Sequence, residues 1–363
     1  MVVKNKKKIV KKIKKILKGT IRIGKDLKIY EFDGASWKVD KKIKLDEKFP
    51  GAGKIINMFK AHNRFNFLVD IKNNKFLKGE LDVDGEAMGA RINILPDGKK
   101  LDKAYCLLNP GLDINVETGH SSHWDIIYRN KGGTYSYVYA LEKKKNKSNK
   151  KYQKVEDFDK HYPLLEKNVL KGLQNREDDF AVPMLTLIKT CMRVGGEIYY
   201  KTHKHQGLAT LTKKNISISG NRVNFNFTAK DGVELALGEV FPPKYVERLK
   251  SMLKPLKSSD FVFTNKNTGH PLKDTDFEDA FEGYCGVRFY PHIVRSHYAT
   301  QTVKDYIKRN PNAEKDEIKQ LFTEIAEKLG HRKFVKKHNA WEDSYSVTMH
   351  YYIQPEVLEK IRL

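Results

Sequence analysis

The sequence predicts an α+β protein with a β-rich N-terminal domain and a mainly helical C-terminal domain that contains a small three-stranded sheet. Short alternating apolar stretches separated by Asp-Gly turns occupy the first part of the chain, and apolar positions at helical spacing dominate the second. A lysine-rich stretch lies between them. The length of 363 residues favours two domains, and at 39% hydrophobic residues the chain has enough apolar material for packed cores.

The composition favours a polyanionic partner. The chain has 69 lysine and arginine residues against 45 acidic ones, a formal net charge of +24, and nucleic acid is the first candidate. No apolar run approaches the ~18 residues of a membrane span, and no N-terminal segment is typical of a secretory signal. Three cysteines without a CxxC pair exclude a disulfide scaffold and a cysteine-based zinc site. We therefore expect an intracellular protein that associates with DNA; cytoplasm or nucleoid, nucleus and viral particle remain open.

Residues 1–20 form a strongly basic tail with nine lysines and no acidic residue. Ile9, Ile13 and Ile16 recur at helical spacing, and Gly19 can end a short helix. We interpret this segment as a solvated, partly helical tail that contacts DNA non-specifically. A nuclear-import signal, a DNA-gripping arm and a membrane-surface helix are alternatives between which the sequence does not decide.

Residues 21–142 are predicted to form the β-rich domain, with one or two helices. Turn signals such as Asp33-Gly34 separate its short apolar stretches. Residues 143–154 are predicted to be a flexible linker, because a segment with so few apolar residues cannot bury enough surface to become ordered. The predicted strands of the domain are 21–23, 27–32, 65–71 and 91–95.

Residues 155–363 are predicted to form the mainly helical domain. Apolar positions at 164–170 and 182–191 each fit one face of a helix. Helices resume near Pro243, and helical patterns dominate from Asp276 to the end. The three strands expected between these helices are 216–218, 223–227 and 233–237.

Five positions in this domain carry side chains suited to chemistry on a phosphate. Arg193 follows an apolar helix in Cys-Met-Arg-Val-Gly-Gly-Glu, and Lys230 lies in the turn between two predicted strands. Arg295 ends His-Ile-Val-Arg, His331 ends Leu-Gly-His, and Tyr352 begins Tyr-Ile-Gln-Pro. Each alone has an ordinary explanation, such as a surface ion pair, a solvated lysine or a packing tyrosine. Their order along the chain carries the signal.

That order resembles the type IB DNA topoisomerases of the small poxviral and bacterial kind. Arg-Val-Gly-Gly-Glu-Ile-Tyr at 193–199, followed by Gly-Leu-Ala-Thr-Leu, looks like the signature of that family. The segment 227–232 resembles its β-hairpin lysine, 292–295 its second arginine box, and Tyr-Ile-Gln-Pro its tyrosine box. Upstream, 128–137 looks like the glycine-basic-aromatic segment that ends the N-terminal domain. The resemblance covers roughly residues 125 to 360, and five weak motifs in the family's order make a strong joint signal.

The resemblance implies an enzyme that relaxes supercoiled duplex DNA by transient cleavage of one strand, without ATP, a cofactor or a metal. Tyr352 would be the nucleophile and form a 3′-phosphotyrosyl intermediate, whose bond energy allows resealing. Arg193 and Arg295 would bind the non-bridging oxygens with paired donors that lysine cannot reproduce. His331 would donate a third hydrogen bond, and Lys230 would protonate the departing 5′-oxygen.

Further DNA contacts are predicted at Lys131, Tyr135, Tyr137, Tyr199 and His292. Packing on a strand is an equal interpretation for Tyr135 and Tyr137. A flexible linker between two basic domains suits a monomeric, C-shaped clamp that closes round double-stranded DNA. Binding by such a clamp would weaken steeply with salt, because phosphate contacts release counterions.

Two departures from the family pattern bear on the predicted nucleophile and its surroundings. His292 opens the second arginine box, where lysine is usual and where tyrosine recombinases often have histidine. A segment that looks like an inserted basic loop, 332–343, lengthens the gap from the histidine to Tyr352. It leaves Tyr345 and Tyr351 as alternative nucleophiles, although the Ile-Gln-Pro that follows favours Tyr352.

Two other functions are open alternatives. A tyrosine recombinase or integrase uses nearly the same site but exchanges strands within a tetramer. Against it, only 11 residues follow Tyr352, and the N-terminal half is β-rich where recombinases are helical. A non-catalytic DNA-binding module that has kept the fold would bind DNA in a salt-sensitive way and form no covalent adduct.

Overall fold

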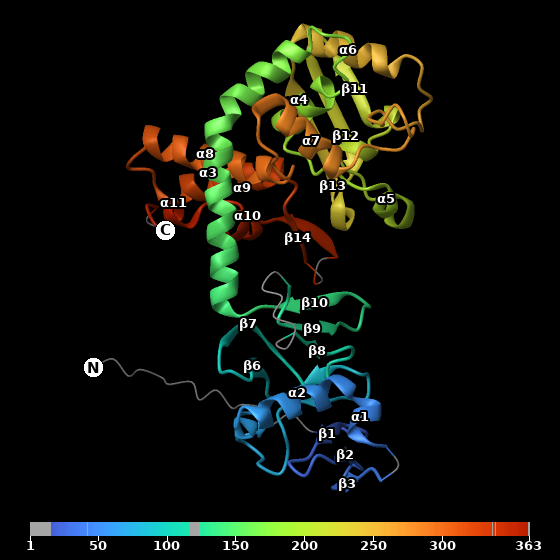
Figure 1. The fold of residues 1–363 in the computed structure, drawn as a ribbon, viewed down its shortest axis with the longest axis vertical. Helices are drawn as coiled ribbons and strands as arrows, with labels where there is room; N and C mark the ends of the chain where they lie inside the picture. Colours follow the sequence, from blue (N-terminus) through green and yellow to red (C-terminus); the bar gives the residue numbers. More distant parts are fainter. Residues whose placement is uncertain (1–15, 42, 116–122, 336, 338, 362–363) are drawn as a thin grey trace, which may run out of the picture. The chain divides into compact units, whose positions relative to one another are not determined.

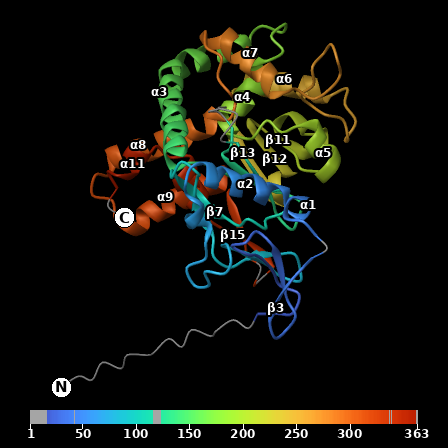
Figure 2. The ribbon, with the colours of Figure 1, turned by 60° about the horizontal axis from the view of Figure 1, so that its bottom comes forward.

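The computed structural model describes residues 16–361 except 42, 116–122, 336 and 338. The chain divides into two compact units, residues 1–149 (unit 1) and 150–363 (unit 2). Each unit has its own buried apolar cluster. Figures 1 and 2 show strands throughout unit 1 and mainly helices in unit 2, which confirms the predicted α+β class. Residues 1–15, most of the predicted basic tail, lie outside the described residues.

Unit 1 is built from short antiparallel strands. One sheet has five strands in the order β3-β2-β1-β4-β5, in which Ile21 of β1 lies between Glu31 and Leu81. A second sheet has the order β10-β9-β8, and β6 pairs with β7. The strands are β1 (Ile21–Ile23), β2 (Ile29–Phe32), β3 (Trp37–Val39), β4 (Glu80–Leu81), β5 (Ala87–Met88), β6 (Ile92–Ile94), β7 (Lys100–Tyr105), β8 (Asp113–Ile114), β9 (Ile126–Arg129) and β10 (Tyr135–Val138).

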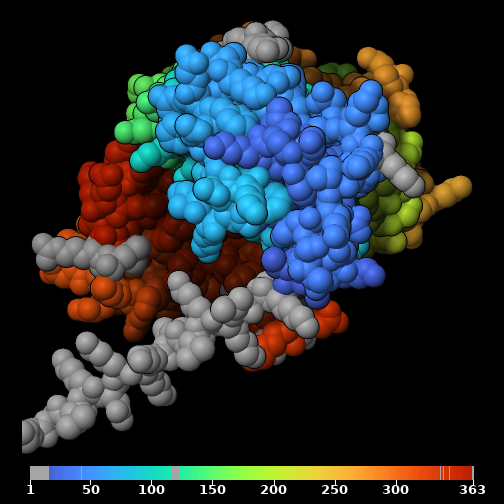
Figure 3. Space-filling view, turned by 90° about the horizontal axis from the view of Figure 1, so that it is seen from below, coloured from blue at the N-terminus to red at the C-terminus, as the bar shows by residue number. Residues whose placement is uncertain are grey.

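Helix α2 (Pro50–Ala61) contributes one face to the core of this unit. Ile55 and Phe59 are fully buried there, one helical turn apart. The short helix α1 (Leu45–Lys48) precedes it, and the 3₁₀ helix η1 (Phe65–Leu68) follows. In the space-filling view of Figure 3, the blue and cyan segments of unit 1 form one continuous surface.

The predicted strand at 65–71 is wrong. Its first half is η1, and a turn follows in which the Asp70 carboxylate accepts a hydrogen bond from the backbone N–H of Lys72 at 3.0 Å. The alternating pattern does not correspond to a buried face, because Phe67 and Ile71 are 47% and 92% exposed. The other three predicted strands are found as β1, β2 and β6.

The flexibility predicted for the linker at 143–154 is wrong, since helix α3 runs from Leu141 to Gly172. The division between the two units does fall within this segment, between residues 149 and 150. Lysine is a good helix former, and Lys143 in the first turn forms an ion pair with Asp125 at 2.9 Å. Farther along, the apolar face that begins at Tyr152 is buried in the core of unit 2. The lysine run is helical because both of its flanks are fixed by packing or pairing, which its own composition does not reveal.

Unit 2 contains the predicted three-stranded antiparallel sheet, in the order β11-β12-β13. Val223, Phe225 and Phe227 alternate along the central strand and are buried against the surrounding helices. The strands are β11 (Ile216–Ser219), β12 (Arg222–Thr228) and β13 (Glu234–Val240). The helices are α4 (Ala181–Thr190), α5 (Glu197–His203), α6 (Pro243–Leu253), α7 (Asp274–Cys285), α8 (Ile293–Arg309), α9 (Lys315–Lys328), α10 (Ser346–Tyr351) and α11 (Pro355–Leu358), with 3₁₀ turns η2 (Leu208–Thr210), η3 (Lys213–Asn215) and η4 (Lys230–Gly232).

The segment expected to be an inserted basic loop is instead a β-hairpin. Strand β14 (Arg332–Val335) pairs antiparallel with β15 (Ala340–Asp343). The rings of Phe334 and Trp341 pack edge to face across the pair, with centroids 5.3 Å apart. The hairpin leads into α10, at whose end Tyr352 lies.

Candidate active site

Arg193 lies in an irregular segment that follows the buried helix α4. The helix ends at Cys191, whose backbone has a φ of 54°, and the C=O of Arg193 then accepts a hydrogen bond from the N–H of Leu208 at 2.9 Å. Gly195 and Gly207 approach so closely that a Cβ on Gly195 would lie 2.8 Å from the Cα of Gly207. The glycines of the arginine signature therefore serve to fix the backbone that presents Arg193.

Arg295 lies in the first turn of α8 and is only 2% exposed. Its Nη1 donates to the C=O of Cys191 and its Nη2 to the C=O of Leu329, both at 2.7 Å. Nη2 also lies 3.1 Å from Nε2 of His331. Within the described part of the chain, the Nε of Arg295 has no hydrogen-bond partner. The carbonyls orient this guanidinium without neutralising its charge, which leaves it available to an anion.

The hydroxyl of Tyr352 lies among basic side chains. It accepts a hydrogen bond from Nη2 of Arg193 at 3.1 Å and lies 2.9 Å from Nε2 of His292. The guanidinium carbon of Arg295 is 5.3 Å from the centroid of the Tyr352 ring, and the centroid of the His331 ring is 4.6 Å away. Four of the five residues named from the motifs, together with His292, thus meet in one cluster.

The two alternative tyrosines lie in different surroundings. Tyr351 is 55% exposed, and its backbone C=O accepts a hydrogen bond from the Lys151 ammonium group. Tyr345 packs its ring against Phe322, with centroids 5.9 Å apart. Tyr352 is the one of the three whose hydroxyl accepts a hydrogen bond from Arg193.

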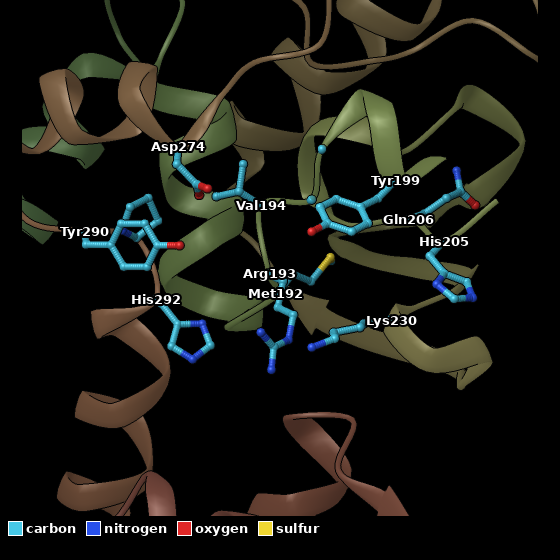
Figure 4. Close-up of a pocket in the computed structure, with 13 residues that line it drawn as sticks. Met192, Arg193, Val194, Tyr199, His205, Gln206, Lys230, Asp274, Tyr290 and His292 are labelled. Atoms are coloured by element: carbon cyan, nitrogen blue, oxygen red, sulfur yellow. The ribbon is translucent and has the colours of Figure 1, made fainter. Parts of the chain in front are cut away.

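Lys230 lies at the tip of the hairpin formed by β12 and β13. Asp231 and Gly232, with φ values of 64° and 80°, complete the turn and leave Lys230 exposed. Lys230 lines a cavity of about 380 Å³ together with Arg193 and His292 (Figure 4). Lys230 therefore faces the same cavity as Arg193 and His292, which both contact the Tyr352 hydroxyl.

Burial and nearby cations favour the neutral forms of both histidines. The pKa of His292 is lowered to about 3, first by burial and then by the charges of Arg295 and Arg193. The same three causes lower the pKa of His331 to about 3. Because Arg193 donates to the Tyr352 hydroxyl, the phenolic hydrogen can point at Nε2 of neutral His292, which can accept it.

Acid is expected to destabilise the folded protein through these two histidines. Their pKa values lie below the ordinary 6.5 in the folded state, so the unfolded chain binds more protons between pH 6.5 and about pH 3. Their contribution to stability is complete above pH 6.5 and is lost as the pH falls toward 3. The thermal unfolding midpoint should therefore drop between pH 7 and pH 4.5, and drop less in His331→Gln. The exposed His350 provides the matched control, His350→Gln, which should drop as far as the wild type. Equal drops in all three proteins would contradict the expectation.

The predicted DNA contacts fall in both units. In unit 1, Tyr135 and Tyr137 of β10 are 53% and 47% exposed, and Lys131, in the turn before that strand, lies 3.5 Å from Glu86. In unit 2, Tyr199 of α5 lines the cavity and is 68% exposed. These exposures leave the aromatic rings accessible, and contact with DNA stays a prediction.

Two residues beside the cluster were missed by sequence reasoning. The Nζ of Lys151, in α3, lies 5.1 Å from the centroid of the Tyr352 ring, and burial lowers its pKa to about 8. Thr348, in α10, lies within hydrogen-bond distance of His331. Lys151 could not be distinguished within its lysine run. Thr348 precedes Tyr352 by four residues, a helical spacing that places both on one face and is the signal that could have found it.

The family comparison covers the part of the chain that carries this cluster. Residues 140–353, more than half of the chain, match the family described as eukaryotic DNA topoisomerase I, catalytic core. The chain belongs to this family. The matched range contains the topoisomerase motifs from Arg193 to Tyr352, and the resemblance drawn from them is confirmed.

Individual relatives of this topoisomerase family member are distant. A DNA topoisomerase 1B of Acanthamoeba polyphaga mimivirus is 28% identical over 108 residues, which span 29% of this chain and 32% of that protein. The chain thus covers about a third of the length of that relative. Two solved structures of the XerH site-specific recombinase were also found, each with a TM-score of 0.31. The pre-cleavage complex with difH substrate is 18% identical, and the match covers 47% of this chain and 46% of that one. The post-cleavage complex with palindromic difH substrate is 16% identical, and the match covers 47% of this chain and 45% of that one.

Proposed function

We propose that this protein is a type IB DNA topoisomerase, which relaxes supercoiled duplex DNA by cleaving one strand through a 3′-phosphotyrosyl intermediate and resealing it without ATP. The observation that carries the proposal is the hydrogen bond from Arg193 to the hydroxyl of Tyr352, inside a cluster that also contains Arg295 and His331. The family match supports the same activity.

The arginines supply the binding site for the scissile phosphate. Attack on a phosphodiester builds negative charge on its two non-bridging oxygens, and positioned N–H donors stabilise that charge. Arg193 borders the cavity and reaches the attacking oxygen, so it can bind the phosphate next to the nucleophile. Arg295, whose guanidinium carbon lies 5.3 Å from the centroid of the Tyr352 ring, adds a second positive charge beside the nucleophile. His331 adds a hydrogen bond to the same phosphate.

Cleavage requires two proton transfers, and the chain has a group for each. The Tyr352 oxygen forms a bond to phosphorus and loses its hydrogen to Nε2 of neutral His292, 2.9 Å away. The bond from phosphorus to the 5′-oxygen breaks, and Lys230 donates a proton to that oxygen from the hairpin tip. Resealing runs the same steps in reverse, because the phosphotyrosyl bond conserves the energy of the broken bond.

A plasmid relaxation assay tests the proposal. Purified protein should convert negatively supercoiled plasmid into a ladder of topoisomers in the presence of EDTA and without ATP. Denaturation during the reaction should trap protein attached to the 3′ end of a nicked strand. Supercoils that persist at high enzyme excess, with no trapped adduct, would leave only a DNA-binding protein.

The same assay distinguishes a topoisomerase from a tyrosine recombinase. Paired linear duplexes that carry candidate sites are included beside the plasmid, and exchange between them is scored by fragment length. A topoisomerase removes supercoils and leaves the duplexes unjoined. Exchange without relaxation would assign the chain to the recombinases, which use nearly the same residues.

We also propose double-stranded DNA as the partner of a monomeric protein. Support comes from the net charge of +24 and from the exposed aromatic rings of Tyr135, Tyr137 and Tyr199. Independence from metal ions and the clamp arrangement remain predictions. In the described part of the chain, no helix is long and apolar enough to span a membrane.

A further inference from the structure

The imidazole of His331 has a defined partner on each nitrogen. Its Nε2 lies 3.1 Å from Nη2 of Arg295, and its Nδ1 lies 2.8 Å from the Oγ1 of Thr348. His331 is 8% exposed and Thr348 is fully buried. Water is therefore largely excluded from this pair, and the protein partners decide where the hydrogen on the ring resides.

These contacts assign the tautomer in the DNA-free protein. A guanidinium only donates hydrogen bonds, so Nε2 next to Arg295 must hold a lone pair. The ring hydrogen then sits on Nδ1 and is donated to Oγ1 of Thr348. The groups that face His331 are Arg295 and Thr348 on its two nitrogens and Tyr352 at its ring, with the charge of Arg193 also acting on it. Within the described residues, the hydrogen-bond partner of Nε2 is Arg295.

This form of His331 cannot perform the role that the proposed function gives it. Donation to a phosphate oxygen needs a hydrogen on Nε2, where the DNA-free site has a lone pair. A phosphate anion beside Arg295 would favour protonation of Nε2, because an adjacent negative charge stabilises the imidazolium. The proton comes from solvent and Nδ1 keeps its hydrogen. Alternatively the Nδ1 hydrogen leaves to solvent as one enters at Nε2.

We propose that Thr348 is a positioning residue for His331, which holds the ring while its Nε2 changes from acceptor in the empty site to donor toward the bound phosphate. This inference rests on the proposed function. A threonine hydroxyl suits the task because it accepts from an Nδ1–H and, after rotation, donates to a bare Nδ1. The ring therefore keeps its partner and its orientation in every protonation state. Thr348 lies four positions before Tyr352 in the chain, so the same helix end places the nucleophile and fixes the histidine.

Two substitutions separate the hydroxyl from the shape of the side chain. Thr348→Val keeps the branched shape and removes the hydroxyl, whereas Thr348→Ser keeps the hydroxyl. In single-turnover cleavage of a nicked suicide duplex, Thr348→Val should slow adduct formation about 10- to 100-fold, by analogy with the loss when a metal-bound histidine is deprived of the partner that orients it. Thr348→Ser should restore most of the rate. In a His331→Ala background, Thr348→Val should have little further effect, because both changes act through one group.

Nitrogen NMR of histidine-labelled protein provides a readout that does not depend on activity. The His331 signals are identified by their loss in His331→Gln. The DNA-free wild type should show a neutral ring with the hydrogen on Nδ1, and Tyr352→Phe bound to duplex DNA should show a hydrogen on Nε2. In Thr348→Val, His331 should no longer be held in the single neutral tautomer with its hydrogen on Nδ1. The thermal unfolding midpoint of the variant shows whether it is folded.

The outcomes distinguish the two levels of the proposal. A wild type that forms no adduct overturns the proposed function itself. An active wild type with an equally active Thr348→Val, or an unchanged His331 tautomer in that variant, overturns the role of Thr348 alone. A folded Thr348→Val that is slow in every background, including His331→Ala, would show a general structural effect instead.

Discussion

Tyr352→Phe is expected to abolish the covalent protein–DNA adduct while leaving DNA affinity within about twofold of the wild type, because phosphate contacts made elsewhere supply most of the binding free energy. The variant loses only the oxygen that Arg193 and His292 contact, and keeps the ring beside Arg295 and His331. Adduct yield is measured on a suicide duplex after denaturation, and affinity by fluorescence anisotropy with the same duplex.

Tyr351→Phe and Tyr345→Phe are the matched controls for this prediction. Each removes one phenolic oxygen from the same short segment of the chain, so general effects on folding are comparable. Both should form adduct at rates close to the wild type. A full adduct yield from Tyr352→Phe, together with its loss in either control, would move the nucleophile to that tyrosine and leave the Arg193 contact without a catalytic meaning.

The features of the fold that the sequence predicts are those with a strong local pattern. The three-stranded sheet of unit 2 could be predicted because Val223, Phe225 and Phe227 alternate along one strand and are all buried. Helix α3 could not be predicted over its lysine run, since its order depends on Asp125, which pairs with Lys143, and on the core of unit 2. The strand predicted at 65–71 is wrong for the opposite reason, because its apolar residues alternate along the chain but do not share a buried face.

The candidate site likewise has a part that the sequence predicts and a part that it does not. The five motif residues could be named because each lies in a short motif with a chemical meaning: Arg193, Lys230, Arg295, His331 and Tyr352. The groups that orient them could not, because such contacts join segments far apart in the sequence. Arg295 takes its orientation from backbone carbonyls 104 and 34 residues away, and a carbonyl has no sequence signature. The closeness of His292 to Tyr352 likewise depends on how α8 packs beside the end of α10.

Arg193→Gln should reduce the single-turnover rate of adduct formation about 100- to 1,000-fold, the usual cost of removing one donor that stabilises a developing oxyanion. Glutamine keeps a polar amide but is shorter than arginine by two bonds, so it withdraws the donor from the Tyr352 oxygen and removes both the charge and the paired geometry. Arg193 is a cleaner target than Arg295, whose removal would also leave two buried carbonyls without their donor. Arg193→Lys restores the charge but not the two parallel N–H donors of a guanidinium, so it should recover only part of the loss. The rate is measured at saturating protein, so that weaker binding does not contribute.

The control for charge is Arg309→Gln, at the far end of α8 from His292, where the side chain is exposed. It removes the same unit of charge from unit 2 and should leave the saturated rate unchanged, because an exposed charge away from the reacting phosphate is screened by salt. If Arg193→Gln and Arg309→Gln slow cleavage equally, the effect of Arg193 is one of overall charge, and its hydrogen bond to Tyr352 does not contribute to the reaction. A large loss in Arg193→Gln alone, partly restored by lysine, requires a guanidinium at the phosphate that Tyr352 attacks.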